Sequence, residues 1–278
     1  MLSSLFFFMF FMFMFAIVVH GDFNADGKII WREDHVKITE NGSLLQLTLD
    51  EASGSGYQLK DRYLFGEFQM KMKLVPGYSA GTVTTFYLRS EGNYTQDEID
   101  FEFIGNIEGE PYTVSTNIIT QGKGNREQHF KLWFNPTEDF HIYSILWNLH
   151  QILLSVDGIP IRTFPNIEEK GVPYLKDLPM NVTMTIWHAS WVEKRPIDWS
   201  HAPFVASYRD YGVDACVWAK GKSFCPLSKK SWWDKVLDPE GEEKLKLVQT
   251  NSMTYNYCTD TKRFTQGLPP ECSLISYA

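Results

Sequence analysis

The sequence lacks the features of a nucleic-acid-binding or metal-dependent protein. Its 278 residues include 34 Asp and Glu against 26 Lys and Arg, a net charge of −8. This balance gives no basic surface to neutralise phosphates, so we expect no nucleic-acid partner. The seven His show no spacing typical of metal ligands, which predicts no zinc site. The glycines at 121–124 are not followed by the Gly-Lys-Ser/Thr of a phosphate loop, and we expect no cofactor.

The N-terminus lacks an apolar run long enough to span a membrane comfortably. Leu5–Val19 is apolar over fifteen residues, which matches the core of a secretory signal peptide. Val19 and Gly21 are small residues at the −3 and −1 positions of a cut after Gly21. We therefore expect residues 1–21 to be removed and the mature protein to be secreted, with no stable membrane association. An uncleaved anchor is the alternative, and no Lys or Arg precedes the run.

Helical periodicity is missing from residues 28–211, where no apolar stripe of helical spacing reaches ten residues. Short runs of strand character occur there instead, several with strict alternation of apolar and polar residues. These runs lie at 45–49, 68–74, 82–88, 98–103, 112–120, 129–134, 141–147, 152–156, 159–164, 182–187 and 204–211. Asp157-Gly158 between two runs is a strong hairpin signal. The pattern predicts an all-β domain over 22–211, an antiparallel two-sheet sandwich or a barrel.

Acidic residues occupy one face of the strand predicted at 98–103. Glu98, Asp100 and Glu102 alternate with apolar residues, so all three carboxylates point to the same side. Asp and Glu are depleted in strands and neighbouring like charges repel, so three acids in this pattern indicate a function. An acidic solvated strand or a set of calcium ligands remains as the structural alternative.

Paired carboxylates are the groups that cleave glycosidic bonds, one as nucleophile and one as proton donor. In this interpretation Glu98 is the nucleophile, Glu102 the general acid and then base, and Asp100 a helper between them. The charge of Glu98 would raise the proton affinity of Glu102. Their Cα atoms are separated by roughly 13 Å of strand, while a retaining pair needs carboxyl groups about 5–5.5 Å apart. Side chains that lean together can close much of this gap.

The stretch Asp97–Asn106 resembles the signature of the xyloglucan endotransglucosylase/hydrolases, plant cell-wall enzymes of glycoside hydrolase family sixteen. Asn125–Gln128 and Tyr257–Phe264 also match that family. The resemblance implies a curved, concanavalin-like jelly-roll sandwich whose concave face holds the glycan. One departure lies beside the acids, where Gln96 stands in place of the usual His.

The resemblance also implies a set of residues that bind the polysaccharide. They are Ser115, Thr116, Asn117, Asn125, Arg126, Glu127, Ser190, Trp191 and Arg263. Relatives commonly have Gln at position 115 and Asp at position 190, and the loop 192–198 is shorter here than in most of them. Without the resemblance, the sequence alone would predict that 121–127 is a hairpin loop and that Arg263 is a surface charge.

The composition changes in residues 212–278, which we interpret as a short C-terminal extension with one helix. Asp238-Pro239-Glu240 is a helix-start signal. All four cysteines lie in this region and allow three pairings. The shortest loops favour Cys216–Cys225 and Cys258–Cys272, and the resemblance implies the same pairs. Candidate glycosylation sites are Asn41, Asn93 and Asn181.

The function predicted from these features is retaining, endo-acting transglycosylation in the cell wall or apoplast. The enzyme would cleave the β-1,4-glucan backbone of xyloglucan and transfer the new end to another xyloglucan chain. Its partners would be donor and acceptor xyloglucan, and we expect a monomer. The alternatives are a xyloglucan endohydrolase, a related β-glucanase with another linkage preference, and a carbohydrate-binding wall protein with weak catalysis.

Overall fold

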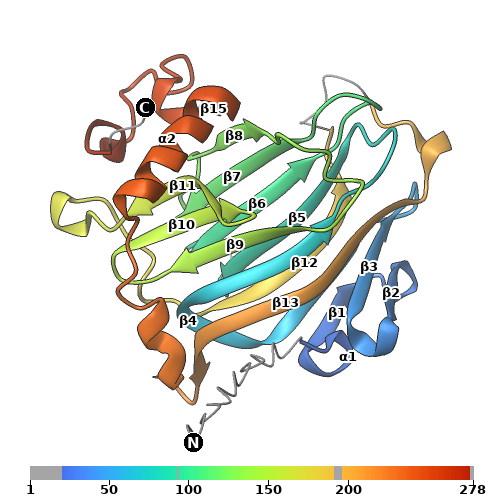
Figure 1. The fold of residues 1–278 in the computed structure, drawn as a ribbon, viewed down its shortest axis with the longest axis horizontal. Coiled ribbons are helices and arrows are strands. Elements are labelled where there is room, and N and C mark those ends of the chain that lie inside the picture. The colour runs from blue at the N-terminus through green and yellow to red at the C-terminus, as the bar shows by residue number, and fades with distance from the viewer. Residues whose placement is uncertain (1–20, 93, 191–195, 276–278) are drawn as a thin grey trace, which may run out of the picture.

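Antiparallel strands form two packed layers in this protein (Figure 1). The structure, a computed structural model, describes residues 21–92, 94–190 and 196–275. The strands are β1 (Gly27–Trp31), β2 (Val36–Thr39), β3 (Leu44–Leu49), β4 (Ser55–Lys73), β5 (Thr82–Ser90), β6 (Glu98–Ile104), β7 (Thr113–Ile119), β8 (Gln128–Lys131), β9 (His141–Trp147), β10 (Gln151–Val156), β11 (Ile159–Pro165), β12 (Met180–His188), β13 (Phe204–Ala219), β14 (Lys222–Phe224) and β15 (Met253–Asn256). The two helices of the described region are α1 (Phe23–Asp26) and α2 (Pro239–Ser252).

The layer that we call the cleft sheet has the order β15-β8-β7-β6-β5-β12-β4, with β1 on the far edge of β4. The outer sheet has the order β11-β10-β9-β4-β13-β3-β2. β4 belongs to both because its first half pairs with β12 and its second half with β9. Gly66 lies at this crossing, where a Cβ would be only 2.3 Å from the Cβ of Ala215 on β13. Glycine therefore allows the two strands to approach.

The apolar face of β6 anchors the cleft sheet to the outer sheet. Ile99, Phe101 and Phe103 are fully buried. The ring of Phe103 lies 4.6 Å from that of Tyr143 on β9, in an edge-to-face contact across the sandwich. Phe101 stacks between Phe103 and Phe86 of β5. This packing turns the acidic face of β6 outward.

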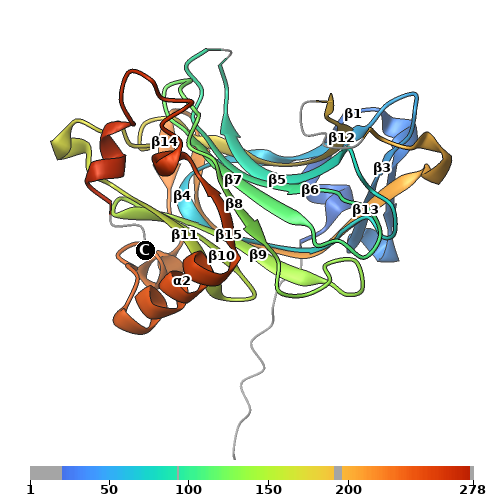
Figure 2. The ribbon, with the colours of Figure 1, turned by 90° about the horizontal axis from the view of Figure 1, so that it is seen from above.

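The predicted antiparallel sandwich with a helix near the C-terminus is confirmed, and Figure 2 shows the curvature of the sheet that contains β5 and β6. The sequence missed β1, β2, β14, β15 and the first half of β4. Residues 55–67 carry scattered charges and glycines that break the period-two pattern. Pairing with β12 and β1 holds this half of β4 extended despite its weak pattern. The predicted boundary at 211/212 lies inside β13, so the sheet continues through the change in composition.

The C-terminal extension packs against the edge of the sandwich. Asp238 caps α2 and accepts a hydrogen bond from the Gly241 N–H at 2.7 Å, as the helix-start signal predicts. α2 then packs along β11. The disulfides Cys216–Cys225 and Cys258–Cys272 are confirmed. Across the described residues, helices are too short or too polar to span a bilayer.

Candidate active site

The three carboxylates of β6 line one pocket, so the prediction that they share a face is confirmed. The pocket has a volume of about 370 Å³ and lies on the cleft sheet, over β5, β6 and β12. Glu98 and Glu102 are half-buried at its floor, and Asp100 between them is only 6% exposed. The apolar residues that alternate with them are in the core, which fixes the direction of all three acids.

Cross-strand pairing gives each of the first two acids a polar neighbour. Glu98 lies opposite Arg89 of β5, and Arg89 Nε is 3.6 Å from Glu98 Oε2. Asp100 lies between Tyr87 of β5 and Asn117 of β7. These side chains share the face of the acids because paired residues in a sheet point to the same side.

A polar row crosses the cleft sheet at Glu102. The carboxylate lies between Thr85 of β5 and Ser115 of β7, and the Ser115 hydroxyl donates to Glu102 Oε2 at 3.3 Å. The row continues through His129 of β8 to Tyr255 of β15, whose rings are 4.9 Å apart. The C-terminal extension thus supplies one end of the same surface.

Burial raises the pKa of all three carboxyl groups. It raises the pKa of Glu102 from 4.5 to about 7, against the lowering effect of the Ser115 hydrogen bond. Burial and the charges of Glu98 and Glu102 raise the pKa of Asp100 well above its ordinary value. Burial also raises the pKa of Glu98, while Arg89 and a hydrogen bond from Asp100 lower it. Because Glu98 has the cation beside it, we expect it to ionise before the other two.

Tryptophan side chains form the wall of the pocket beyond β12. Trp187 ends the row of cleft-facing residues on β12, and Trp31 of β1 is 37% exposed. Trp31 Nε1 donates to Ser53 Oγ at 3.0 Å, which fixes the ring. Gly56 lies below it, and a Cβ there would be 3.3 Å from the indole. Partly exposed indoles next to polar groups suit the apolar faces of pyranose rings.

The opposite end of the surface is a charged cluster between the 125–127 segment and the extension. Arg263 Nη1 donates to Glu127 Oε2 and Arg263 Nη2 to Asn125 Oδ1, both at 2.7 Å. Arg263 Nη1 also contacts the Tyr255 hydroxyl at 3.3 Å. The structure therefore brings Asn125, Glu127 and Arg263 together at the surface.

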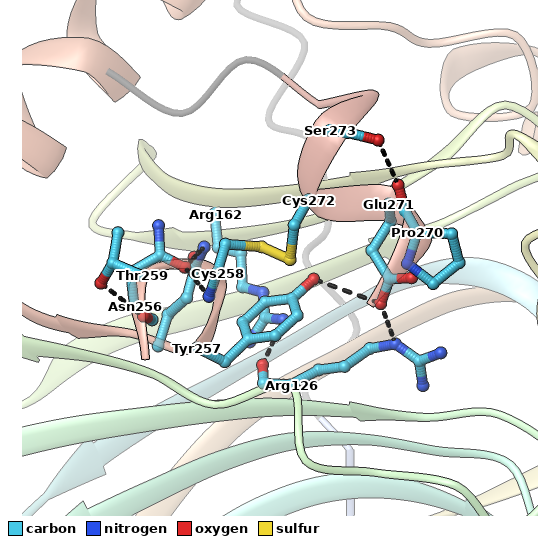
Figure 3. Close-up of a disulfide and its surroundings, with 11 residues drawn as sticks. Arg126, Arg162, Asn256, Tyr257, Cys258, Thr259, Pro270, Glu271, Cys272 and Ser273 are labelled. Atoms are coloured by element: carbon cyan, nitrogen blue, oxygen red, sulfur yellow. Dashed lines mark hydrogen bonds and ion pairs between the residues drawn. A yellow bond between two sulfur atoms is a disulfide. The ribbon is translucent and has the colours of Figure 1, made fainter. Parts of the chain in front are cut away.

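Two residues of the predicted binding set are buried away from the cleft. Thr116 is fully buried because it pairs with Phe101 on the core face of β7, and its hydroxyl donates to the Gln128 carbonyl. Arg126 is 8% exposed, and its guanidinium is paired with the buried carboxylate of Glu271 (Figure 3). The predictions that these two side chains contact sugar are corrected, since neither reaches the cleft surface.

The remaining predicted positions fall into three groups. Ser115 and Asn117 lie on the cleft face, where Asn117 Oδ1 accepts from the Arg126 N–H at 3.1 Å. Ser190 is exposed just beyond β12. Trp191 lies outside the described residues, and so does most of the loop that follows it.

The candidate glycosylation sites differ in their surroundings. Asn41 is exposed. Asn181 lies inside β12, and its Nδ2, the atom that a glycan would modify, donates to the carbonyls of Leu59 and Asp61 at 3.1 and 3.0 Å. These contacts disfavour a glycan at Asn181. Asn93 lies outside the described residues.

Sequence reasoning missed several residues of the site, namely Trp31, Tyr87, Arg89, His129 and Tyr255, and it missed Glu271 as the buried partner of Arg126. The alternation at 82–88 gave a strand but not its neighbour, so Tyr87 and Arg89 could not be assigned to the acids. Pairing of the strands at 82–88 and 98–103 as a hairpin would have placed Tyr87 and Arg89 beside the acids. Within the described ranges, no three His, Cys, Asp or Glu side chains are grouped to hold a metal ion.

Comparison with known proteins identifies the family. Residues 23–203 match the model of glycosyl hydrolases family 16, and residues 228–272 match that of the xyloglucan endo-transglycosylase C-terminus. The chain belongs to glycosyl hydrolases family 16. Within this family it is 54% identical to probable xyloglucan endotransglucosylase/hydrolase protein 23 of Arabidopsis thaliana, over 91% of this chain and 92% of that protein. It is 51% identical to xyloglucan endotransglucosylase protein 8 of Diospyros kaki, over 91% of this chain and 90% of that protein.

Solved structures of two glucanases have a similar fold. A prokaryotic β-1,3-1,4-glucanase from a mouse hindgut metagenome is 27% identical, with a TM-score of 0.54 over 69% of this chain and 86% of that one. A Bacillus licheniformis β-glucanase is 23% identical, with a TM-score of 0.56 over 70% of this chain and 95% of that one. The predicted jelly-roll sandwich is therefore confirmed. These structures cover less of this chain than the xyloglucan endotransglucosylase relatives do.

Proposed function

We propose that this protein is a retaining, endo-acting transglycosylase of xyloglucan that serves cell-wall construction and remodelling. It cleaves the β-1,4-glucan backbone and transfers the new end to a second xyloglucan chain. The names of the similar proteins from Arabidopsis thaliana and Diospyros kaki support this substrate. The match of the extension to a xyloglucan endo-transglycosylase C-terminus supports it as well.

The chemistry follows from the unequal surroundings of the two glutamates. In the first step the Glu98 carboxylate attacks the anomeric carbon, and the bond to the leaving oxygen breaks as Glu102 donates its proton. Glu102 can carry that proton at weakly acidic pH because burial raises its pKa to about 7. Asp100, protonated and hydrogen-bonded to Glu98, orients the nucleophile. The grouping of Glu98, Asp100 and Glu102 in one pocket, with Arg89 beside Glu98 and Ser115 beside Glu102, is the observation that carries the proposal.

In the second step Glu102 removes a proton from an acceptor hydroxyl, which displaces Glu98 from the glycosyl-enzyme. The acceptor is either a sugar 4-hydroxyl or water. Orientation can outweigh the abundance of water if the cleft holds the sugar in attack geometry. We assign Ser115, Asn117, Ser190, Trp191 and Arg263 to binding of the polysaccharide, together with Asn125 and Glu127.

Incubation with xyloglucan and a labelled short xyloglucan oligosaccharide tests the proposal. We expect the label to enter polymer in wild type and to stay free in Glu98→Gln. The matched control is Glu110→Gln, which removes an exposed acid outside the pocket. New reducing ends without labelled polymer would favour an endohydrolase, and an unchanged product profile in Glu98→Gln would remove this residue as nucleophile.

Location and organisation complete the proposal. We infer a signal peptide at 1–21, a catalytic domain at 22–211 and an extension at 212–278, with export of a monomer to the apoplast. Two disulfides suit an oxidising compartment. The N-terminal sequence of the secreted protein tests the cut after Gly21.

A further inference from the structure

We propose that Arg89 is a positioning residue for the nucleophile, holding Glu98 as an oriented carboxylate in the free enzyme and receiving that carboxylate when the glycosyl-enzyme breaks. This role rests on the proposed function, because it requires Glu98 to be the nucleophile.

The position of Arg89 is fixed by the sheet. It pairs directly with Glu98 across β5 and β6, and its Nε lies 3.6 Å from Glu98 Oε2. The Arg89 side chain is 43% exposed and lines the pocket, while that of Glu98 is 15% exposed. The contact therefore lies at the border between the pocket and solvent, and the guanidinium is the more exposed of the two groups.

Among the described residues, the other groups on β5 and β6 near Glu98 supply no positive charge. On β5, Tyr87 is neutral because burial raises its pKa to about 12. On β6 itself, Asp100 and Glu102 are acids, and Asp97 is a buried acid just before the strand. Each of these groups is neutral when protonated and negative when deprotonated, so none can replace the positive charge of Arg89.

The third strand of the site, β7, also presents no charge to the nucleophile. It places Ile119 opposite Glu98 and Asn117 opposite Asp100. Arg162, fully buried, lowers the pKa of Asp100 and donates to the carbonyl of Thr116. Among the groups that face Glu98 in the described part of the chain, Arg89 is thus the cation.

The charge on Glu98 changes twice in each catalytic cycle. The carboxylate becomes a neutral ester when the sugar is attached and is ionised again when the acceptor displaces it. A neighbouring cation favours the two ionised states over the ester. Loss of Arg89 should therefore raise the pKa of free Glu98 and slow the departure of the carboxylate from the glycosyl-enzyme. A residue with a purely structural role would do neither.

Three variants test this role. Arg89→Gln removes the cation, Arg89→Lys keeps a cation, and Arg62→Gln is the matched control. Arg62 lies in the same row of the cleft sheet, separated from Arg89 by Asn181 of β12, and pairs with Glu91. Transfer to a labelled xyloglucan oligosaccharide is measured from pH 4 to 8, and the glycosylated fraction of the enzyme is measured by mass spectrometry after rapid quenching.

We expect the acid limb of kcat/KM in Arg89→Gln to move up by about one pH unit, with a larger glycosylated fraction during turnover. Arg89→Lys should show a smaller shift, and Arg62→Gln none. An unmoved acid limb and an unchanged glycosylated fraction in Arg89→Gln would overturn the role of Arg89, with Glu98→Gln still inactive. Activity in Glu98→Gln would instead overturn the proposed function. If Arg89→Gln folds poorly, the test passes to Arg89→Lys, and melting followed by circular dichroism checks that Arg89→Lys is folded.

Discussion

Two regions of this protein bury charged side chains in opposite ways. On β6, three acids stand on one face, and burial together with their mutual repulsion raises the pKa of Asp100 and Glu102. At the junction of the 121–127 segment with the extension, buried Arg126 is instead paired with fully buried Glu271. In the proposed function the first arrangement prepares carboxyl groups for proton transfer, while the second joins the extension to the sandwich. The acids of β6 thus have other acids as close neighbours, whereas the buried acid of the junction has a buried cation as its partner.

The junction is also the place where the fold joins distant parts of the chain. Figure 3 shows Glu271 between Arg126 and Tyr257, whose hydroxyl donates to Glu271 Oε1 at 3.4 Å. The neighbouring residue Cys272 forms the disulfide with Cys258. Glu271 is thus fixed by the extension and fixes the backbone next to Asn125 and Glu127. On β6, by contrast, Glu98 has the partly exposed Arg89 as its cationic partner, at 3.6 Å.

The largest difference between the regions should appear in Glu98→Gln. We expect a loss of transfer activity of about 10⁴-fold or more, because removal of a nucleophile abolishes the covalent step. The melting temperature should stay the same or rise, since one of three repelling acids becomes neutral. Activity assays and thermal denaturation measure the two effects. A large loss of stability in Glu98→Gln would contradict the comparison.

Glu271→Gln should show the reverse behaviour. Removal of one partner from a buried ion pair leaves the charge of Arg126 uncompensated and costs about 3–5 kcal/mol of unfolding free energy. Activity of the molecules that remain folded should fall much less than in Glu98→Gln. Urea denaturation measures the loss, with Glu242→Gln on the exposed side of α2 as control.

The double variant Arg126→Met/Glu271→Gln sharpens this result. It removes both charges, so we expect it to regain part of the stability that Glu271→Gln loses. Equal stabilities of the single and double variants would show that the pair does not hold the junction.

The pH dependence of stability should distinguish the catalytic acids from ordinary surface acids. Glu102 has a folded pKa of about 7 against an ordinary 4.5, so the native state binds more protons than the unfolded state between these values. Its contribution is fully present below about pH 4.5 and is lost as the pH rises through 7. As the pH rises over this range, the free energy of unfolding of Glu102→Gln should therefore fall less than that of the wild type. Denaturation at pH 4.5 and 7.5 checks the slope, and identical slopes would argue against the raised pKa.

The smallest effect should come from Arg263→Ala at the exposed edge of the junction. Its ion pair with Glu127 is partly exposed, so we expect a loss of less than about 1 kcal/mol of stability. The KM for the acceptor oligosaccharide should rise several-fold, about 1 kcal/mol of binding, with little change in kcat. Lys262→Ala, an exposed neighbour, is the control. Equal acceptor KM values in both variants would remove Arg263 from the binding set.

The contrast between the regions also explains which predictions from the sequence were correct. The acidic face of β6 was predictable because alternation with Ile99, Phe101 and Phe103 leaves only one way to orient the strand. Thr116 was misassigned because adjacent strand residues point to opposite faces, and the motif match did not say which face of β7 meets the cleft. Arg126 was misassigned because its partner Glu271 lies far away in the sequence.

The sequence by itself determined the strand-rich sandwich, the helix that begins at Pro239, the two disulfides and the shared face of the three acids. These features depend on local periodicity, capping and short cysteine loops, which act between residues close in the chain. The tertiary structure decided that Arg89 lies beside Glu98, that Tyr255 joins the cleft and that Glu271 neutralises Arg126. These contacts depend on the register between strands and on the docking of the extension, and no local pattern of residues encodes either.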